Sequence, residues 1–263
     1  MTAIVLRREY LTPQRRLIIA RSIAGSLASI VPIPFVDDWV LAAVLGGGYR
    51  RIAEAHGVDL SDEAVTNLVH GKTPPPSPAQ LAVSGIMYRV AGVAAKRMLL
   101  ALATMNRARA ASRTFVTMTL FDHYCAKLHT GTALDGATAL ALREEIARAI
   151  DQTPGALALH PFRKGLAAAA RAALKAPLEL ADLASGGALR KLVARKSTVT
   201  EAEAVNDVEQ AIEQQLADKQ GFLARTVAAV EGQLSADGNP FLDNALDALD
   251  RRWRARVAAG TTK

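Results

Sequence analysis

Proline- and glycine-rich breaks divide this chain into segments that have the length of helices and lack the alternating pattern of strands. Between the breaks the sequence is rich in Ala and Leu, which have high helix propensities, and only 5% of its residues are aromatic. Apolar residues recur at near-helical spacing, most regularly from Val205 to Leu234. We therefore predict an all-α protein, a multi-helix bundle that is elongated or consists of two abutting helical subdomains.

Individual prolines predict where helices stop. Pro32 and Pro34 should end a helix that begins at Thr12, because proline lacks an amide donor and disfavours a helical residue before it. The proline-rich run 73–78 favours an extended strap or linker. These breaks delimit three regions: an N-terminal helical hairpin region (1–72), a central basic helical region (78–197), and C-terminal amphipathic helices that are acidic with a basic tail (198–263). Alternatively, the three regions form one continuous domain.

Capping residues predict further helix boundaries. Gly57 should end the second helix and Ser61 should begin the third, since glycine tolerates a left-handed conformation and serine accepts a hydrogen bond from a free amide. Later in the chain a helix is expected from about 136 to 151, and Asn239, followed by proline, should begin the last helix. His56 directly precedes Gly57 and is interpreted as part of a helix end rather than as a site.

The segment 25–57 combines two helices rich in small residues with an intervening Ile-Pro-Ile-Pro turn. Glycine inside a helix costs up to about 1 kcal/mol against alanine, so three consecutive glycines require a compensating gain in packing. Small residues at a spacing of four let two backbones approach closely, which favours a tight antiparallel hairpin; an oligomerising or membrane-dipping hairpin is the functional alternative. The motif consists of Pro32, Pro34, Asp37, Asp38, Gly46, Gly47 and Gly48.

Asp37 and Asp38 could form a metal-binding or acid–base pair, but their position favours another role. They fall in the first turn of the predicted second helix, where carboxylates accept hydrogen bonds from free amides and face the positive end of the helix dipole. A metal would need more ligands, and none lies nearby in the sequence. We interpret the pair as capping residues and predict no metal site.

The order of a small-residue helix, Ile-Pro-Ile-Pro, an aspartate and an apolar helix that ends in Ile-Ala and His-Gly resembles a known family. It is similar to bacterial helical domains found beside Era-like and dynamin-like GTPase domains, and to the EcsC-like family. The resemblance implies an all-helical, membrane-associated accessory domain. The sequence contains no P-loop motif, so nucleotide hydrolysis is not supported. The matching residues are Pro32, Pro34, Asp37, Ile52, Ala53 and Gly57.

The chain carries a net charge of +7, which is compatible with an anionic partner such as lipid headgroups or nucleic acid. Residues 81–130 hold seven basic residues and one acid, whereas residues 198–250 hold two basic and eleven acidic residues. The acidic C-terminal helices are expected to pack near the basic middle and neutralise it; a basic face presented to phosphates is the functional alternative. The residues of that face are Arg89, Lys96, Arg97, Arg107, Arg109, Arg113, Arg163, Lys164 and Arg171.

Asp122, Cys125 and His129 fall on one face of a predicted helix, at steps of three and four residues. A Cys–His pair can provide an activated nucleophile, so an enzyme that uses these three residues is one alternative. The preferred interpretation is a buried cysteine beside a helix-terminal histidine. Because Cys125 is the only cysteine, no intramolecular disulfide can form, and the reducing cytoplasm is the expected compartment.

These observations favour a non-enzymatic helical contact module. It would act as an adaptor or scaffold that binds a protein partner, or as a peripheral protein on an anionic membrane surface at the inner membrane face. The sequence has no run of about 18 apolar residues for a spanning helix, and it predicts no cofactor. Homo-oligomerisation through the small-residue hairpin is a further expectation. Nucleic-acid binding is the less favoured alternative, because few aromatic residues interleave the basic ones.

Overall fold

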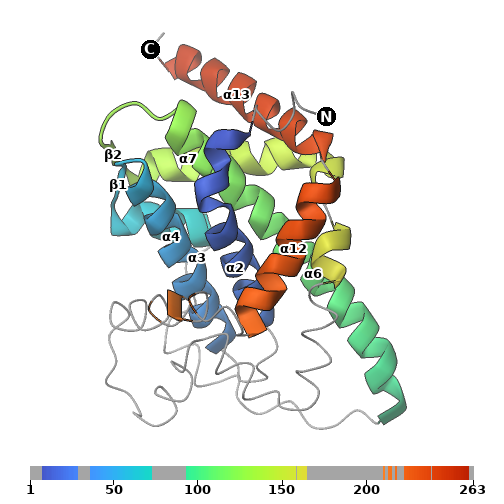
Figure 1. Ribbon diagram of the computed structural model, residues 1–263. Coiled ribbons are helices and arrows are strands. Elements are labelled where there is room, and N and C mark those ends of the chain that lie inside the picture. Colours follow the sequence, from blue (N-terminus) through green and yellow to red (C-terminus); the bar gives the residue numbers. More distant parts are fainter. Residues whose placement is uncertain are drawn as a thin grey trace, which may run out of the picture.

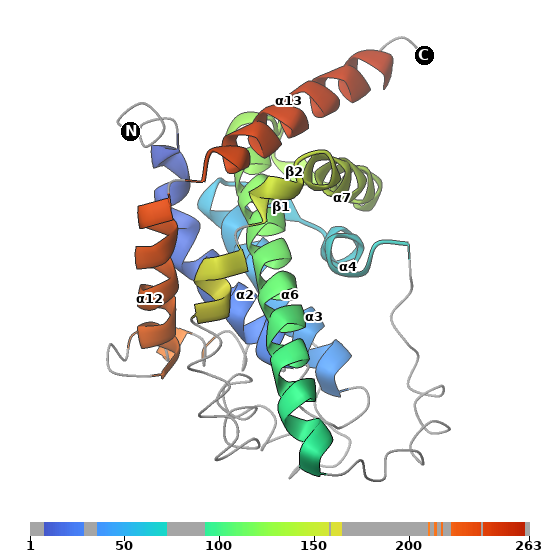
Figure 2. The ribbon, with the colours of Figure 1, turned by 90° about the vertical axis from the view of Figure 1, so that its right-hand side faces the viewer.

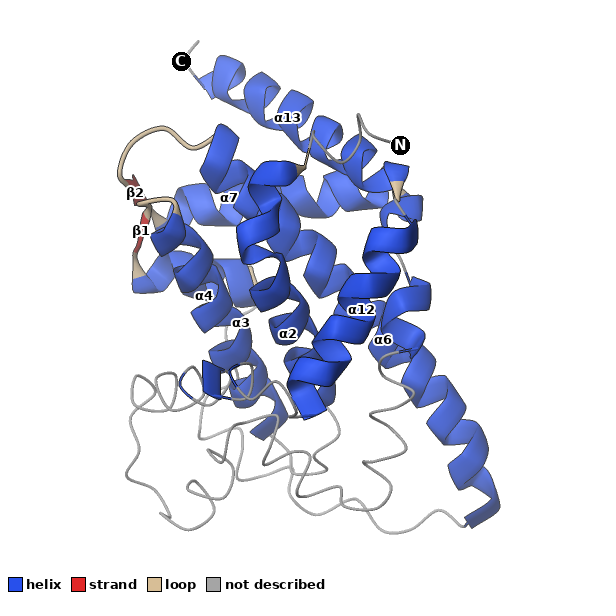
Figure 3. Cartoon of the chain, viewed as in Figure 1, coloured by secondary structure: helices blue, strands red, loops and turns tan. Residues whose placement is uncertain are grey.

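Helices dominate the computed structural model, which describes residues 8–28, 36–72, 93–157, 159–164, 222–237 and 239–260 and the single positions 210, 213, 214 and 217. Of the described residues 86% are helical, which confirms the all-α prediction (Figures 1 and 3). The helices are α2 (Thr12–Ala28), α3 (Val36–Ala55), α4 (Asp62–His70), α6 (Val93–Lys127), α7 (Gly136–Asp151), α12 (Phe222–Asp237) and α13 (Pro240–Gly260), with 3-10 turns η1 (Glu9–Leu11) and η2 (Pro154–Ala156).

The predicted capping residues act at the ends of these helices. Ser61 Oγ accepts a hydrogen bond from the backbone amide of Ala64 at 3.1 Å, and Asn239 Oδ1 accepts one from Phe241 at 3.0 Å. Gly57 has a φ of 67°, a left-handed conformation that glycine adopts without strain. The local chemistry of the chain therefore sets the boundaries of α3, α4 and α13, as the sequence predicts.

α6 is the helix around which the others are arranged (Figures 1 and 2). α2 and α3 pack along it, α12 lies beside α2, and α4 packs against α3 and α7. α7 and α13 cross one end of this group, and the last turns of α13 extend beyond it (Figure 2). Every side chain of α6 from Met118 to Cys125 is buried, so this stretch is enclosed on all sides, whereas the preceding turns keep one face in solvent at Arg109 and Arg113.

The buried apolar side chains form one hydrophobic cluster. It includes Ile19 and Ile52 from the predicted N-terminal region, Phe121 from the central region, and Val227 and Leu249 from the C-terminal region. Each of these five side chains is fully buried. The described parts of the three predicted regions therefore share a core, whose burial is the main favourable term in folding.

One feature departs from a purely helical expectation, because two short segments pair as parallel strands. β1 (Asp59–Leu60) pairs with β2 (Ala133–Leu134), so the connection after α3 is tied to the connection after α6. Leu60 and Leu134 point into the core, with exposed fractions of 8% and 1%. A two-residue strand is too short to show an alternating pattern, so the sequence carries no periodic signal for it.

The glycines of the small-residue motif serve more neighbours than predicted. α2 and α3 pack against each other, and a Cβ on Gly48 would lie 3.5 Å from Arg21 Cγ of α2 and 2.7 Å from Met118 Cε of α6. A Cβ on Gly46 would lie 3.1 Å from Val65 Cγ1 of α4. The small residues therefore admit α4 and α6 as well as α2, because α3 packs against several helices at once.

The remaining motif residues are placed in part. Gly47 is buried within α3. Asp37 and Asp38 fall in the first turn of that helix, and the prediction that they cap it rests on this position. Pro32 and Pro34 lie outside the described residues.

None of the helices described here combines the length and apolarity that crossing a bilayer requires.

Gly48→Leu should lower the free energy of unfolding by about 1–3 kcal/mol, because overpacking against Met118 outweighs the gain in helix propensity. The matched variant is Gly232→Leu in α12, where a Cβ meets nothing within 4 Å and the propensity gain should raise stability by about 0.5–1 kcal/mol. Urea unfolding followed by circular dichroism measures both. Equal effects at the two positions would show that α3 and α6 do not meet at Gly48.

Candidate functional site

A charged clamp joins the N-terminal end of the described chain to α13. Arg8 Nε donates to Asp243 Oδ1 at 2.6 Å, and Arg8 Nη2 donates to Asp243 Oδ2 and to the carbonyl of Asn239, both at 2.5 Å. The side chains of Arg8 and Asp243 are only 18% and 10% exposed. A bidentate pair with this little solvent is held more firmly than a surface ion pair.

A second set of polar contacts involves Tyr10, two residues after Arg8, and is centred on His123. His123 of α6 bonds Asp250 Oδ1 of α13 through Nε2 at 2.6 Å, and its Nδ1 bonds the hydroxyl of Tyr10. Because an ionised carboxylate only accepts, Nε2 carries a proton, and in the neutral ring Nδ1 accepts from Tyr10. Lys127 lies over the Tyr10 ring, 4.9 Å from its centroid. These contacts join η1, α6 and α13 around one buried imidazole.

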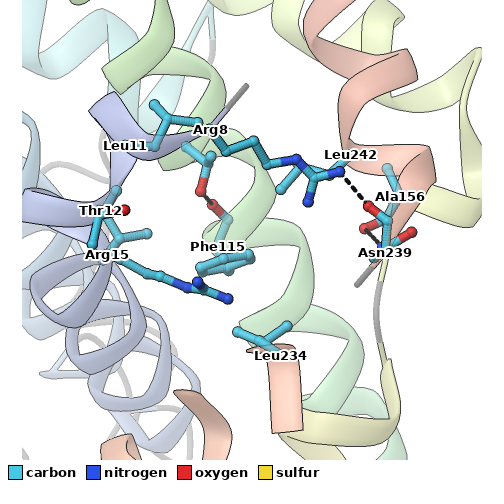
Figure 4. Close-up of a pocket in the computed structure, with 11 residues that line it drawn as sticks. Arg8, Leu11, Thr12, Arg15, Phe115, Ala156, Leu234, Asn239 and Leu242 are labelled. Atoms are coloured by element: carbon cyan, nitrogen blue, oxygen red, sulfur yellow. Dashed lines mark hydrogen bonds between the residues drawn. The ribbon is translucent and has the colours of Figure 1, made fainter. Parts of the chain in front are cut away.

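Next to the clamp lies a cavity of about 60 Å³ (Figure 4). Its walls come from η1 and α2, α6, η2, α12 and the start of α13, and most of them are apolar. Figure 4 shows Arg8 reaching across to Asn239, while the guanidinium of Arg15 extends from α2 past the ring of Phe115. The lining residues are Arg8, Leu11, Thr12, Arg15, Ile18, Phe115, Thr119, Ala156, Leu234, Asn239 and Leu242, and we call this space the Arg15 cavity.

The two arginines of the Arg15 cavity differ in their electrostatic surroundings. Arg8 is neutralised by Asp243. Arg15 makes no hydrogen bond or ion pair with the part of the chain that the structure describes. Burial lowers the pKa of the Arg15 guanidinium, an effect that the charge of Glu231 opposes, although the nearest partner of that carboxylate is Arg16 at 3.5 Å. Arg15 therefore brings a partly desolvated positive charge to an otherwise apolar space.

A larger, open groove of about 860 Å³ lies at the other end of α13. Its lining consists of apolar side chains, here called the floor, and of polar ones that include the exposed basic residues Lys127, Arg254 and Arg256, here called the basic edge. The carboxylate of Asp135 also lines it, but this side chain accepts hydrogen bonds from the amide and hydroxyl of Thr138. The apolar lining residues are Tyr124, Leu128, Ala133, Ala137, Ala141, Trp253, Val257 and Ala258, and we call this surface the α13 groove.

Glu145 fixes the wall of the α13 groove that α13 provides. Its carboxylate, 5% exposed, accepts from Arg148 at 2.7 Å, from Arg252 at 2.7 Å and from Arg256 at 3.3 Å. The last two arginines belong to α13, whereas Glu145 belongs to α7. One carboxylate thus binds three guanidinium groups, which holds the two helices together and leaves a local excess of positive charge.

None of the residues of the predicted basic face whose side chains the structure describes lines the Arg15 cavity or the α13 groove. Arg107 is half-buried, and burial lowers its pKa; Arg113 is exposed and faces Asp151 at 3.5 Å. Arg109, Arg163 and Lys164 are exposed. Lys96 and Arg97 lie in α6, where only the backbone is described, and Arg89 and Arg171 lie outside the described residues. The sequence reasoning missed the arginines that line the cavity and the groove, Arg8, Arg15, Arg254 and Arg256.

The acidic C-terminal segment finds partners other than those expected. Glu213 pairs with Arg51 of α3, Glu231 with Arg16 of α2, and Asp243 with Arg8. These arginines all belong to the N-terminal region, whereas the expectation named the basic middle of the chain. The expectation is corrected for these pairs alone, since Asp250 does contact His123 of the middle region. Glu231 meets Arg16 because α12 packs along α2.

The three side chains of the enzyme alternative have separate surroundings. Asp122 bonds His56 Nε2 at 2.6 Å, and His129 Nδ1 lies 3.2 Å from the hydroxyl of Tyr124. Cys125 is buried, and burial raises the pKa of its thiol, so the reactive thiolate is suppressed. Among the residues that the structure describes, no group of three or more acidic, histidine or cysteine side chains could hold a metal.

The contact between His56 and Asp122 also changes the interpretation of His56. The sequence indicated only a helix end, but the imidazole reaches a fully buried carboxylate 66 positions away. Burial raises the pKa of Asp122, and the hydrogen bond and charge of His56 oppose this effect. An aspartate next to a histidine, in the otherwise uncharged stretch 114–126 of α6, was the available signal, since buried charges need partners.

The fold and these sites define a helical bundle with one small charged cavity and one open groove among its described residues. No family model, no curated protein and no solved structure matches the chain. The resemblance of the segment 25–57 to helical domains associated with GTPases therefore stays a prediction.

Asp243→Asn should lower the free energy of unfolding by about 1–3 kcal/mol, because it leaves the poorly hydrated guanidinium of Arg8 without its bidentate partner. Glu54→Gln is the control: it breaks an exposed pair with Arg51 and should change stability by less than about 0.5 kcal/mol. Urea titrations of both variants measure the difference. Similar small losses in the two variants would show that the clamp contributes no more than a surface pair.

Native Cys125 should react with Ellman's reagent at least roughly tenfold more slowly than the same thiol in urea-unfolded protein. The reason is twofold: the sulfur is buried, and the raised pKa lowers the thiolate fraction at a given pH. Absorbance of the released thiol measures both rates. Faster reaction in the native state would instead indicate an activated cysteine and restore the enzyme alternative.

Proposed function

We propose that this protein is a non-enzymatic helical contact module that binds an acidic, amphipathic segment of a partner protein in the α13 groove. The observation that carries the proposal is the combination of an apolar floor with a basic edge on the same surface. An amphipathic helix binds such a groove by placing its apolar face on the floor. Acidic residues on its flanks would then meet the basic edge.

The chemistry of the edge supports an acidic partner. Lys127 is exposed, the side chain of Arg254 is 75% exposed, and its nearest carboxylate, that of Asp250, lies 4.0 Å away. Arg256 shares Glu145 with two other arginines. Exposed and under-neutralised charges of one sign attract partners of the opposite sign and fix their orientation.

The floor supports a protein ligand rather than a free ion. Val257 is 53% exposed, although it is a large apolar side chain, and it stands beside Trp253 on α13. Burying such a side chain under a partner gains about 25 cal/mol per Å² of apolar surface. An exposed apolar patch with a charged rim is typical of a protein-binding surface.

The alternatives have less support. A peripheral membrane role would use the same arginines, but a concave apolar floor fits an inserted helix better than the plane of a bilayer. Nucleic-acid binding would use the central basic helix α6. Among its described arginines only Arg109 is exposed and makes no ion pair, because Arg107 is half-buried and Arg113 faces Asp151. The enzyme alternative would need Cys125 as a thiolate, which its burial opposes.

A fluorescently labelled, acidic amphipathic peptide of about 18 residues, with leucine at helical spacing and glutamate elsewhere, tests the proposal. Fluorescence anisotropy should show saturable binding to the full chain. The double variant Arg254→Glu/Val257→Glu should weaken binding at least about tenfold, since it reverses the edge charge and breaks the floor. Arg251→Glu, an exposed arginine of the same helix outside the groove lining, is the matched control and should bind within about twofold of wild type.

Three further ligands make the outcome decisive. A lysine-for-glutamate version and a scrambled version of the peptide should both bind more weakly than the acidic amphipathic one. Vesicles that contain phosphatidylserine test the membrane alternative by co-sedimentation at rising salt. If the double variant binds the acidic peptide as well as wild type, or if only vesicles bind, the proposed protein-docking role is wrong. Self-association that depends on Val257 would identify a second copy as the partner.

A further inference from the structure

We infer that the Arg15 cavity is a binding site for a short-chain carboxylate, with the carboxylate at the guanidinium of Arg15 and the carbon chain against Phe115 and Leu234. This site is separate from the α13 groove and shares none of its lining residues. The inference rests on the charge, the walls and the size of the cavity.

The charge selects an anion. Arg8 is engaged by Asp243 and by the carbonyl of Asn239, so it closes one side of the cavity without adding net charge. Arg15 has no hydrogen-bond or ion-pair partner among the described residues, and its guanidinium lies in the cavity wall (Figure 4). A partly desolvated guanidinium gains most from a carboxylate, which can accept two parallel hydrogen bonds.

The walls select an amphipathic ligand. Leu11, Ile18, Phe115, Leu234 and Leu242 surround the space, and each is at most 8% exposed. The hydroxyl of Thr119 donates to the carbonyl of Phe115, so it is already satisfied. An ion such as phosphate would leave these apolar walls without contacts, whereas a hydrocarbon chain fills them.

The size selects a short chain. A buried apolar cavity of about 150 Å³ accommodates benzene, which has six carbon atoms. By the same scale of about 25 Å³ per carbon atom, the 60 Å³ of the Arg15 cavity hold two or three carbon atoms, and the carboxylate lies at the rim beside the partly exposed Arg15. Propionate and butyrate therefore fit, and longer fatty acids would have to leave part of their chain outside the cavity.

Titration of the full chain with sodium propionate, with sodium chloride adjusted to keep the ionic strength constant, tests the site. Isothermal titration calorimetry should show saturable binding at millimolar or lower concentration. Acetate should bind more weakly than propionate, and hexanoate should gain nothing over butyrate. Propionamide, the neutral analogue, should bind at least about tenfold more weakly, because it lacks the charge that Arg15 recognises.

The residue assignment is tested by Arg15→Gln, which should lower the affinity for propionate at least about tenfold. Arg109→Gln is the matched control: this exposed arginine lies in α6 outside the cavity lining and should not alter binding. Circular dichroism checks that both variants are folded. If Arg15→Gln does not fold, Leu234→Phe, which fills the cavity from the opposite wall, should abolish propionate binding.

Three results would overturn the inference. They are absence of saturable propionate binding by the wild-type chain, equal affinities of wild type and Arg15→Gln, and inorganic phosphate binding as tightly as propionate. The last result would mean that the cavity holds any small anion and that its apolar walls do not select the ligand.

Discussion

The stretch Met118–Cys125 of α6 is buried on every side, and this constraint determines where much of the remaining structure must lie. Polar groups in such a stretch lose contact with water, so they need partners from the protein. Thr119 bonds a carbonyl of its own helix, whereas Asp122 and His123 bond residues of other segments. Asp122 bonds His56, which directly follows α3, and His123 bonds Tyr10 and Asp250. Two adjacent residues of one helix thereby hold elements from both ends of the described chain.

This closure around α6 also creates the Arg15 cavity. The N-terminal segment is attached to α13 twice, by the Arg8 clamp and through His123, and α12 packs along α2. The cavity lies where these elements meet over Phe115. Apolar side chains fill most of that junction, but the long polar side chains of Arg8 and Arg15 cannot pack as leucine would. The polar contacts that position the termini therefore leave a small space with a cation at its wall.

The sequence predicts the local features of the fold well and the long-range ones poorly. Ser61, Gly57 and Asn239 act within a few residues of themselves, so the chain around each is sufficient to recognise its role. By contrast, Arg8 and Asp243 are separated by 235 positions, and no pattern in either segment identifies the other. The fold class and most helix ends follow from periodicity and capping; these partners follow only from packing.

The candidate sites show the same division. Counting basic residues along the sequence singled out the central helices, because that is where they are most frequent. The sites proposed from the structure depend instead on which charges lack neutralisation. Gly46 and Gly48 illustrate a related difficulty: their small size indicates a close approach, but the identity of the approaching helix is set by the whole bundle. A single sequence therefore reveals that small or charged residues matter without revealing what they contact.

The charge distribution on α13 links stability to the proposed docking role. Glu145 binds Arg252 and Arg256 of α13 to α7. These ion pairs hold α13 against the bundle, and the helix continues to Gly260 although the residues from Arg254 to Gly260 are all exposed. Since one carboxylate cannot neutralise three guanidinium groups, the same arrangement leaves positive charge beside the apolar floor of the groove. Arg256 thus holds the end of this helix against α7 and also belongs to the groove charges that would attract an acidic partner.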